Sequence, residues 1–313
     1  MLKASPLKHI LLLACILSII AFSAKPAQCG YANTIVVAKS GGDHNNLNSA
    51  VTAAKALNPS KTNPVLIKIM PGQYLHSSLI ELPPYVDIEG SGVNMTVIRF
   101  DQAFGGSKAM QASGSLGATR EIRNFTLEVL GLPDGVTCTL CGTQVGVYVT
   151  NGASLSIRDV NIVPFYGNNM TMGVMIDTAT GETTLQDVTI SFVTTGLEVR
   201  SGGKARLTRT KILRAGSQAL VSSNPSESGW IIMHGCELSV NNPAAGNAIA
   251  ASGSTTIYVV DSSIINGFVR FSVNSSAVML NSLVGTLPMQ FDSTASSQCR
   301  NLYDVNLNDV TCP

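Results

Sequence analysis

Two carboxylates and an arginine stand at matched places in two short strand patterns of this chain. The pattern GVMID begins at Gly173 and ends in Asp177, and the pattern GLEVRS begins at Gly196 and contains Glu198 and Arg200. In a covalent ester hydrolysis one carboxylate attacks, a second donates a proton, and an arginine keeps the first one ionised. Asp177, Glu198 and Arg200 are therefore candidate catalytic residues. The alternative is a surface ion pair between Asp177 and Arg200, with Glu198 solvated.

The neighbours of this trio follow from the alternation of side chains along a strand. The apolar residues at every second position are expected to point inward, so the residues between them form outward rows. Neighbouring parallel strands lie about 4.8 Å apart, which would place Asp177 beside Arg200 and diagonal to Glu198. We expect Tyr148, Thr150 and Met175 to line a ligand groove with them. The two outward rows are Tyr148, Met175 and Glu198, and Thr150, Asp177 and Arg200.

These strand patterns belong to a repeat. From about residue 120 an apolar residue, a short polar pair and further apolar or small residues recur, with starts at Ile122, Ile157, Leu185, Leu207, Met233, Val259 and Met279. Such short strands are unstable alone, but stacked coils can bury one continuous interior. The repeat therefore predicts an all-β fold, a right-handed parallel β-helix. The alternative, an antiparallel sandwich, would place turn signals about every 8–12 residues.

Two local features refine this prediction. One polar residue stands two places after the first apolar residue of several repeats, which predicts a ladder of bends. Its members are Asn124, Asp159, Asp187, Arg209 and Asn281. Before the repeat, Asn45 or Asn46 can cap a short amphipathic helix that closes the open N-terminal end of the stack. Its apolar face contains Leu47, Ala50, Val51, Ala54 and Leu57.

Composition and the chain ends bound the remaining possibilities. The chain has 313 residues, of which 45% are hydrophobic and 12% charged, and a net charge of +1. No basic block is present, so we expect no nucleic-acid partner. Residues 1–29 have the basic start and apolar run of an export signal. We therefore expect a secreted or periplasmic protein without a membrane segment once the signal is removed.

The residues after the signal divide into two predicted parts. Residues 30–295 would form the β-helix with its cap, and residues 296–313 a C-terminal tail. Cys299 and Cys312 are expected to pair and to pin that tail, which requires an oxidising compartment. Cys138 and Cys141 have the spacing of half a zinc site, but no second pair completes it. We expect no metal and no cofactor.

Two segments resemble a known family. VVAKSGGDHNNLNSAVTAA and IKIMPGQYLHSSLIELPPYVDIEGSGVNMTVI, both within residues 34–100, resemble the opening of pectin methylesterases and of exported bacterial relatives in the pectin-lyase-like superfamily. The resemblance implies a right-handed parallel β-helix. The Gln-Asp-Thr-Leu, Asp-Phe-Ile-Phe-Gly and Arg-Pro-Trp segments of pectin methylesterases are absent from the sequence, as is the Gly-His-Gly of polygalacturonases.

The resemblance and the missing motifs together favour one function and leave two others open. We expect an exported protein that presents a side face to a polysaccharide or cell-surface ligand without pectinesterase turnover. A divergent carbohydrate esterase or lyase that acts on a pectin-like polysaccharide is the first alternative. A structural or adhesive module is the second. One scaffold hosts many activities, so the fold alone does not decide among them.

Overall fold

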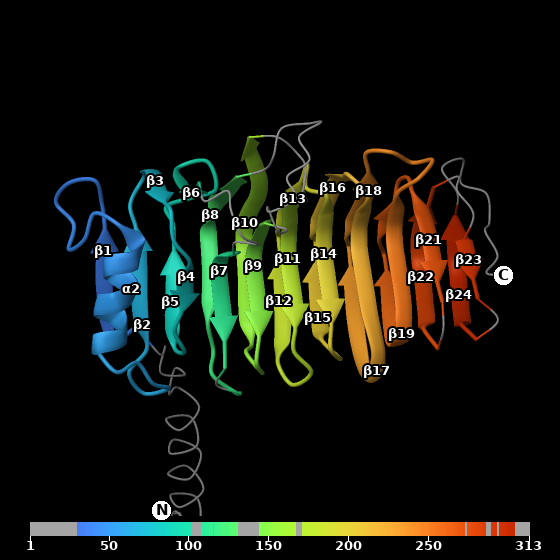
Figure 1. Cartoon of the computed structure of the whole chain (residues 1–313), viewed down its shortest axis with the longest axis horizontal. Helices are drawn as coiled ribbons and strands as arrows, with labels where there is room; N and C mark the ends of the chain where they lie inside the picture. Colours follow the sequence, from blue (N-terminus) through green and yellow to red (C-terminus); the bar gives the residue numbers. More distant parts are fainter. Residues whose placement is uncertain are drawn as a thin grey trace, which may run out of the picture.

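The computed structural model describes residues 30–101, 108–114, 116–130, 144–166, 171–272, 274–285, 289–292 and 294–303. In these ranges the chain forms a stack of parallel strands that begins at β1 and ends at β24 (Figure 1). The predicted export signal, together with Cys138, Cys141 and Cys312, lies outside the described residues. The predicted fold class, a parallel β-helix, is confirmed.

The strands form three faces, and some of them continue from one face to the next. The first face contains β1 (Asn33–Val37), β2 (Val65–Ile69), β5 (Val86–Glu89), β8 (Glu121–Leu130), β10 (Leu155–Tyr166), β12 (Glu182–Gln186), β15 (Lys204–Thr208), the C-terminal parts of β17 (Gln218–His234) and β19 (Asn247–Val260), β22 (Ser276–Val284) and β24 (Ser296–Tyr303).

The second face contains β3 (Gly72–His76), β6 (Thr96–Phe100), β13 (Thr189–Ser191), β16 (Lys211–Ala215), β18 (Glu237–Val240), β20 (Ser263–Ile264) and the C-terminal parts of β8, β10, β22 and β24. The third face contains β4 (Ile80–Leu82), β7 (Lys108–Ser113), β9 (Gln144–Thr150), β11 (Thr171–Asp177), β14 (Thr195–Arg200), the N-terminal parts of β17 and β19, β21 (Phe268–Phe271) and β23 (Met289–Phe291). The candidate residues lie on this third face.

The sequence repeat maps onto the first face residue by residue. The apolar residues that start the repeats are successive Cα partners across β8, β10, β12, β15, β17, β19 and β22. Each of them is at most 1% exposed. Burial of such a side chain is worth about 1.5–3 kcal/mol, so the row is a main source of stability. The row contains Ile122, Ile157, Leu185, Leu207, Met233, Val259 and Met279.

The polar ladder of bends also forms as predicted. Asn124, Asp159, Asp187, Arg209 and Asn281 all adopt left-handed backbone conformations, with φ between 47° and 61°. Asparagine and aspartate tolerate this region better than most residues because their side chains bond the local backbone. The Nε and Nη2 atoms of Arg209 also donate to the two carboxylate oxygens of Asp187, at 2.7 and 2.6 Å.

The one helix of the described residues, α2 (Leu47–Ala56), lies at the β1 end of the stack (Figure 1). Asn46 is its N-cap, and the Oδ1 atom of Asn46 accepts from the Ser49 amide at 2.8 Å. The buried face contains Leu47, Ala50, Val51 and Ala54, and the helix contacts β1, β2 and β4. The remaining residue of the predicted face, Leu57, is instead the C-cap and is 39% exposed, because the helix ends there.

The C-terminal end of the stack extends further than the sequence suggested. Strand β24 pairs in parallel with β22 and continues to Tyr303. The β-helix therefore continues past residue 295, where the tail was expected to begin. Cys299 lies in β24 and is disulfide-bonded. Its expected partner, Cys312, lies outside the described residues, so this pairing stays a prediction. The described part of the chain contains no helix long and apolar enough to cross a membrane.

Candidate functional site

The third face presents the candidate residues in the register that alternation predicts. Met175 is the Cα partner of Tyr148 on one side and of Glu198 on the other, and Asp177 is the partner of Thr150 and of Arg200. The residues between them are fully buried: Val147, Val149, Val174, Ile176, Leu197 and Val199. The two buried apolar residues of each strand thus fix which side chains face outward.

Arg200 forms its ion pair within its own strand. Its Nε atom donates to the Oε1 atom of Glu198, whose side chain is 10% exposed, whereas that of Arg200 is 45% exposed. The ion pair between Asp177 and Arg200 that the sequence offered as an alternative is not among the ion pairs of the described residues, so that expectation was wrong. Residues two apart on a strand point to the same side, and the long guanidinium side chain reaches the glutamate on its own strand.

Asp177 is held by two hydroxyl groups instead. The Tyr148 hydroxyl donates to Oδ2 of Asp177 at 3.1 Å, and the Ser201 hydroxyl donates to Oδ1 at 2.6 Å. Burial, and then the charge and hydrogen bond of Asp177, raise the pKa of Tyr148, so the phenol stays a neutral donor. The Lys108 ammonium lies 3.9 Å from the centre of the Tyr148 ring. The trio therefore separates into a hydroxyl-bound carboxylate and an adjacent glutamate–arginine pair.

Strand β7 adds residues that the sequence interpretation did not include in the groove. Gln111 and Ser113 are the Cα partners of Tyr148 and Thr150, and Glu81 of β4 is the partner of Gln111. The sequence signal for this strand is the alternation of Met110 and Ala112, which are buried, with polar residues between and after them. The outward rows therefore begin two strands before Tyr148.

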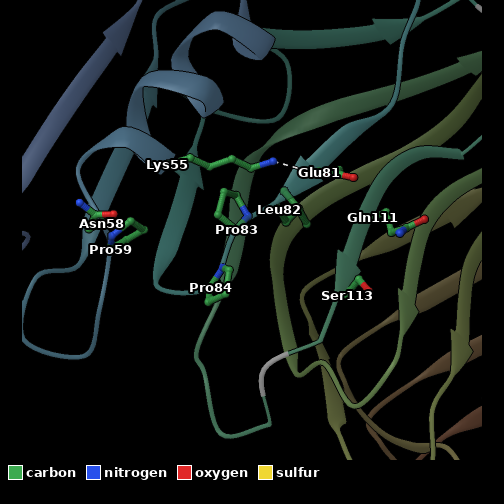
Figure 2. A pocket seen from close by; sticks show the side chains of 9 residues that line it. All are labelled: Lys55, Asn58, Pro59, Glu81, Leu82, Pro83, Pro84, Gln111 and Ser113. Atoms are coloured by element: carbon green, nitrogen blue, oxygen red, sulfur yellow. Dashed lines mark hydrogen bonds and ion pairs between the residues drawn. The ribbon is translucent and has the colours of Figure 1, made fainter.

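A cleft of about 610 Å³ opens where these rows meet α2. Figure 2 shows Asn58 and Pro59 at the end of the helix on one side and Gln111 and Ser113 on the other. The Lys55 ammonium crosses the cleft to the carboxylate of Glu81, 2.8 Å away (Figure 2). The lining is completed by Leu82, Pro83 and Pro84.

Arg120 connects the backbone of two walls of this cleft. It is 2% exposed, and burial lowers its pKa. Its Nε atom donates to the Leu82 carbonyl at 3.1 Å, and its Nη2 atom donates to the carbonyls of Ser113 and Gly114 at 3.0 and 2.9 Å. One buried guanidinium thus ties the end of β4 to the end of β7.

The outward side chains of the third face are suited to hydrogen bonding. Within the described ranges, no group of three or more histidine, cysteine, aspartate or glutamate side chains gathers as a metal site. The third face provides an amide, hydroxyls, carboxylates and a guanidinium in adjacent outward positions. Donors and acceptors in such a row suit a polar ligand that lies across the strands and along the axis of the stack.

One family model and several solved structures are similar to the chain. The model described as "Rhamnogalacturonase A/epimerase, pectate lyase-like" matches residues 38–248. No curated protein sequence matches the chain significantly. Pectin methylesterase PemA from Erwinia chrysanthemi is 16% identical with a TM-score of 0.55, and the match covers 90% of this chain and 91% of that one.

Two further solved structures share the fold. DFA-IIIase from Arthrobacter chlorophenolicus A6 is 15% identical with a TM-score of 0.54, with 84% of this chain and 72% of that one covered. The full-length tailspike protein 2 from the Escherichia coli O157:H7 bacteriophage CAB120 is 14% identical with a TM-score of 0.57, and the match covers 77% of this chain. The chain spans 34% of the length of that tailspike. At these identities the likeness establishes the fold alone.

Proposed function

Because the chain belongs to the rhamnogalacturonase A/epimerase, pectate lyase-like family, we propose that it binds a pectin-type polysaccharide along its third face without pectinesterase turnover. The observation behind this proposal is a band of two adjacent outward rows on that face, which is polar from β7 to β14 except at Met175. It extends from the cleft beside Glu81 through Gln111 and Tyr148 to Asp177 and Arg200.

The chemistry of this row suits a sugar chain. Each hydrogen bond to a ligand hydroxyl is worth about 0.5–1.5 kcal/mol net, so several modest contacts are needed, and a row across adjacent strands provides them in sequence. Arg200 has further N–H groups beyond the one that Glu198 accepts, and its side chain is 45% exposed. It can therefore bind a uronate carboxylate while it keeps its ion pair.

The same geometry argues against ester hydrolysis. In the reaction considered from the sequence, an arginine keeps the attacking carboxylate ionised, but here the guanidinium bonds to the nearly buried Glu198. Asp177 is held by two neutral hydroxyls instead. One observation still favours a divergent carbohydrate esterase as a second candidate: two carboxylates and an arginine do share neighbouring outward positions.

We also propose that the protein acts outside the cytoplasm, as the composition of residues 1–29 suggests. A polysaccharide ligand of this class lies outside cells, which agrees with export. Fractionation of cells that express the full chain tests this point: the mature chain should be found in the periplasm or medium with its first residues removed. Full-length chain retained in the cytoplasm would contradict it.

Binding to immobilised polysaccharides tests the main proposal. The panel contains methyl-esterified pectin, polygalacturonate and an unrelated neutral glucan. Arg200→Ala and Tyr148→Ala should each weaken pectin binding about 5- to 10-fold, the loss of one or two contacts. Arg270→Ala is the matched control, because Arg270 is exposed on the same face towards its other end. Equal effects of Arg200→Ala and Arg270→Ala would refute the proposed location.

Methanol release from the methyl-esterified pectin distinguishes the two candidate functions. We expect no release above the level of a heat-denatured sample over a range of pH. Release that disappears with Asp177→Asn would instead establish the esterase and overturn the proposal of binding without turnover.

A further inference from the structure

The cleft beside α2 is electrostatically balanced. The cleft residues with charged side chains are Lys55 and Glu81, and they neutralise each other at 2.8 Å. Their side chains are 46% and 60% exposed, so both are within reach of a ligand. The centre of the third face differs, because Asp177, Glu198 and Arg200 bring three charges to adjacent positions. A charged sugar loses hydration in the cleft and finds no unpaired opposite charge there, so we expect its binding free energy to be less favourable than that of a neutral sugar.

The walls of the cleft match the apolar and polar sides of a sugar ring. Three prolines and Leu82 provide apolar surface, and Gln111, Ser113 and Asn58 provide hydrogen-bonding groups. Apolar walls with a small number of oriented polar groups are typical of small-ligand sites, and a volume of about 610 Å³ is in their usual range. Pro83 and Leu82 are buried, so their positions do not depend on the ligand.

The cleft is also fixed in shape and continuous with the rest of the third face. Arg120 bonds the backbone at Leu82 and Ser113, which belong to two different walls. Gln111 and Ser113 are Cα partners of Tyr148 and Thr150, so the cleft opens onto the central rows. On the opposite side, Asn58 and Pro59 at the end of α2 bound the cleft (Figure 2).

We propose that this cleft is the terminal subsite of the third face and that it accepts a neutral pyranose residue, either a neutral sugar or a methyl-esterified uronate. This inference rests on the proposed polysaccharide binding. It adds where the bound polysaccharide ends on the third face and which kind of sugar residue occupies that end. The central rows would then hold the part of the ligand that carries free carboxylates, next to Arg200.

Two galacturonan oligosaccharides of equal length, one fully methyl-esterified and one fully de-esterified, test the inference with the full chain in calorimetric titrations. Glu81→Gln leaves Lys55 uncompensated, so it should increase the affinity for the de-esterified oligosaccharide about 2- to 5-fold, as expected for an exposed charge pair. The affinity for the methyl-esterified one should stay within about 2-fold. Gln111→Ala should weaken binding of the methyl-esterified oligosaccharide about 2- to 10-fold.

Gln290→Ala is the matched control for Gln111→Ala. Gln290 is exposed in β23, near the other end of the same face, and its loss should change neither affinity. The subsite is refuted if Glu81→Gln changes both affinities equally, or if Gln111→Ala behaves like Gln290→Ala while Arg200→Ala still weakens binding. If the wild-type protein binds neither oligosaccharide, the proposed function fails and the subsite fails with it.

Discussion

Replacement of Gly173 by alanine would test how tightly the strands that hold the site are packed. Gly146, Gly173 and Gly196 occupy equivalent positions in β9, β11 and β14, and each faces an isoleucine of the second face. A Cβ atom at Gly173 would lie 2.4 Å from Cγ2 of Ile190 and 2.6 Å from the carbonyl oxygen of Gly196. Both contacts are far shorter than van der Waals separation, and one of them involves backbone.

The expected loss of stability follows from two opposing effects. An extra methyl group in a packed core costs about 1–3 kcal/mol. Alanine also reduces the conformational entropy of the unfolded chain, which raises the free energy of unfolding by about 0.4–1 kcal/mol. The free energy of unfolding of Gly173→Ala should therefore fall by about 1–2 kcal/mol. Because Gly173 precedes Asp177 on the same strand, movement of β11 should also weaken polysaccharide binding.

Urea unfolding monitored by circular dichroism measures this loss, with Gly216→Ala as the control. At Gly216 the nearest atom to an added Cβ, the Thr194 Cα, is 3.4 Å away, which is ordinary contact. Gly216→Ala should therefore be neutral or slightly stabilising. Equal unfolding midpoints for the two variants would show that the glycine positions are not close-packed and would refute the reasoning.

Substitutions at three further positions test other parts of the structure. Arg120→Met leaves four backbone carbonyls without their buried donor and should lower the free energy of unfolding by about 1–3 kcal/mol, with partial recovery in Arg120→Lys; no loss in urea unfolding would contradict this role. Burial and the hydrogen bond to Asp87 raise the pKa of Tyr31 from 10.0 to about 12, so its contribution to stability is complete below pH 10 and disappears as pH rises to about 12. Tyr31→Phe should flatten the pH dependence of unfolding in that window, and an unchanged slope would be evidence against it. Asp187 has a φ of 54°, so Asp187→Val should lower the free energy of unfolding by about 1–2 kcal/mol. Asp187→Asn should stay within about 0.5 kcal/mol of the wild type, because asparagine tolerates the left-handed region. Equal urea midpoints for the two variants would refute the strain argument.

The sequence alone was sufficient for the fold and for the register of the central strands. A β-helix repeats one environment once per coil, so the apolar residue that starts each repeat must meet its counterpart in the next coil. Ile157, Leu185 and Leu207 are Cα partners for this reason. Left-handed bends at Asp159 and Asp187 follow equally, because the polar residue recurs at a fixed place after that apolar residue.

Two features of the site depend on information that a repeat does not contain. Strand register brings Arg200 within reach of both Asp177 and Glu198, and the choice of Glu198 is made by side-chain rotamers and by the hydroxyls that bind Asp177. The cleft requires α2, β4 and β7 to meet, and these elements lie in the first, less regular coils. Long-range packing of non-repeating segments leaves no periodic trace in the sequence.

The charged side chains of the rows that contain Glu198 and Arg200 are interrupted after β14 and resume at Arg270, and this interruption limits the size of the expected ligand contact. The outward row that contains Glu198 continues with Val221 and Ala250 before it reaches Arg270, and the row that contains Arg200 continues with the uncharged Ser223 and Ser252. From β4 to β14 there are four steps of about 4.8 Å, or about 19 Å in total. The helix end closes this stretch on one side, and uncharged side chains, first Val221 and Ser223, follow it on the other. We therefore expect a short oligosaccharide to make the contacts with Tyr148, Asp177 and Arg200 that are proposed for a long polysaccharide.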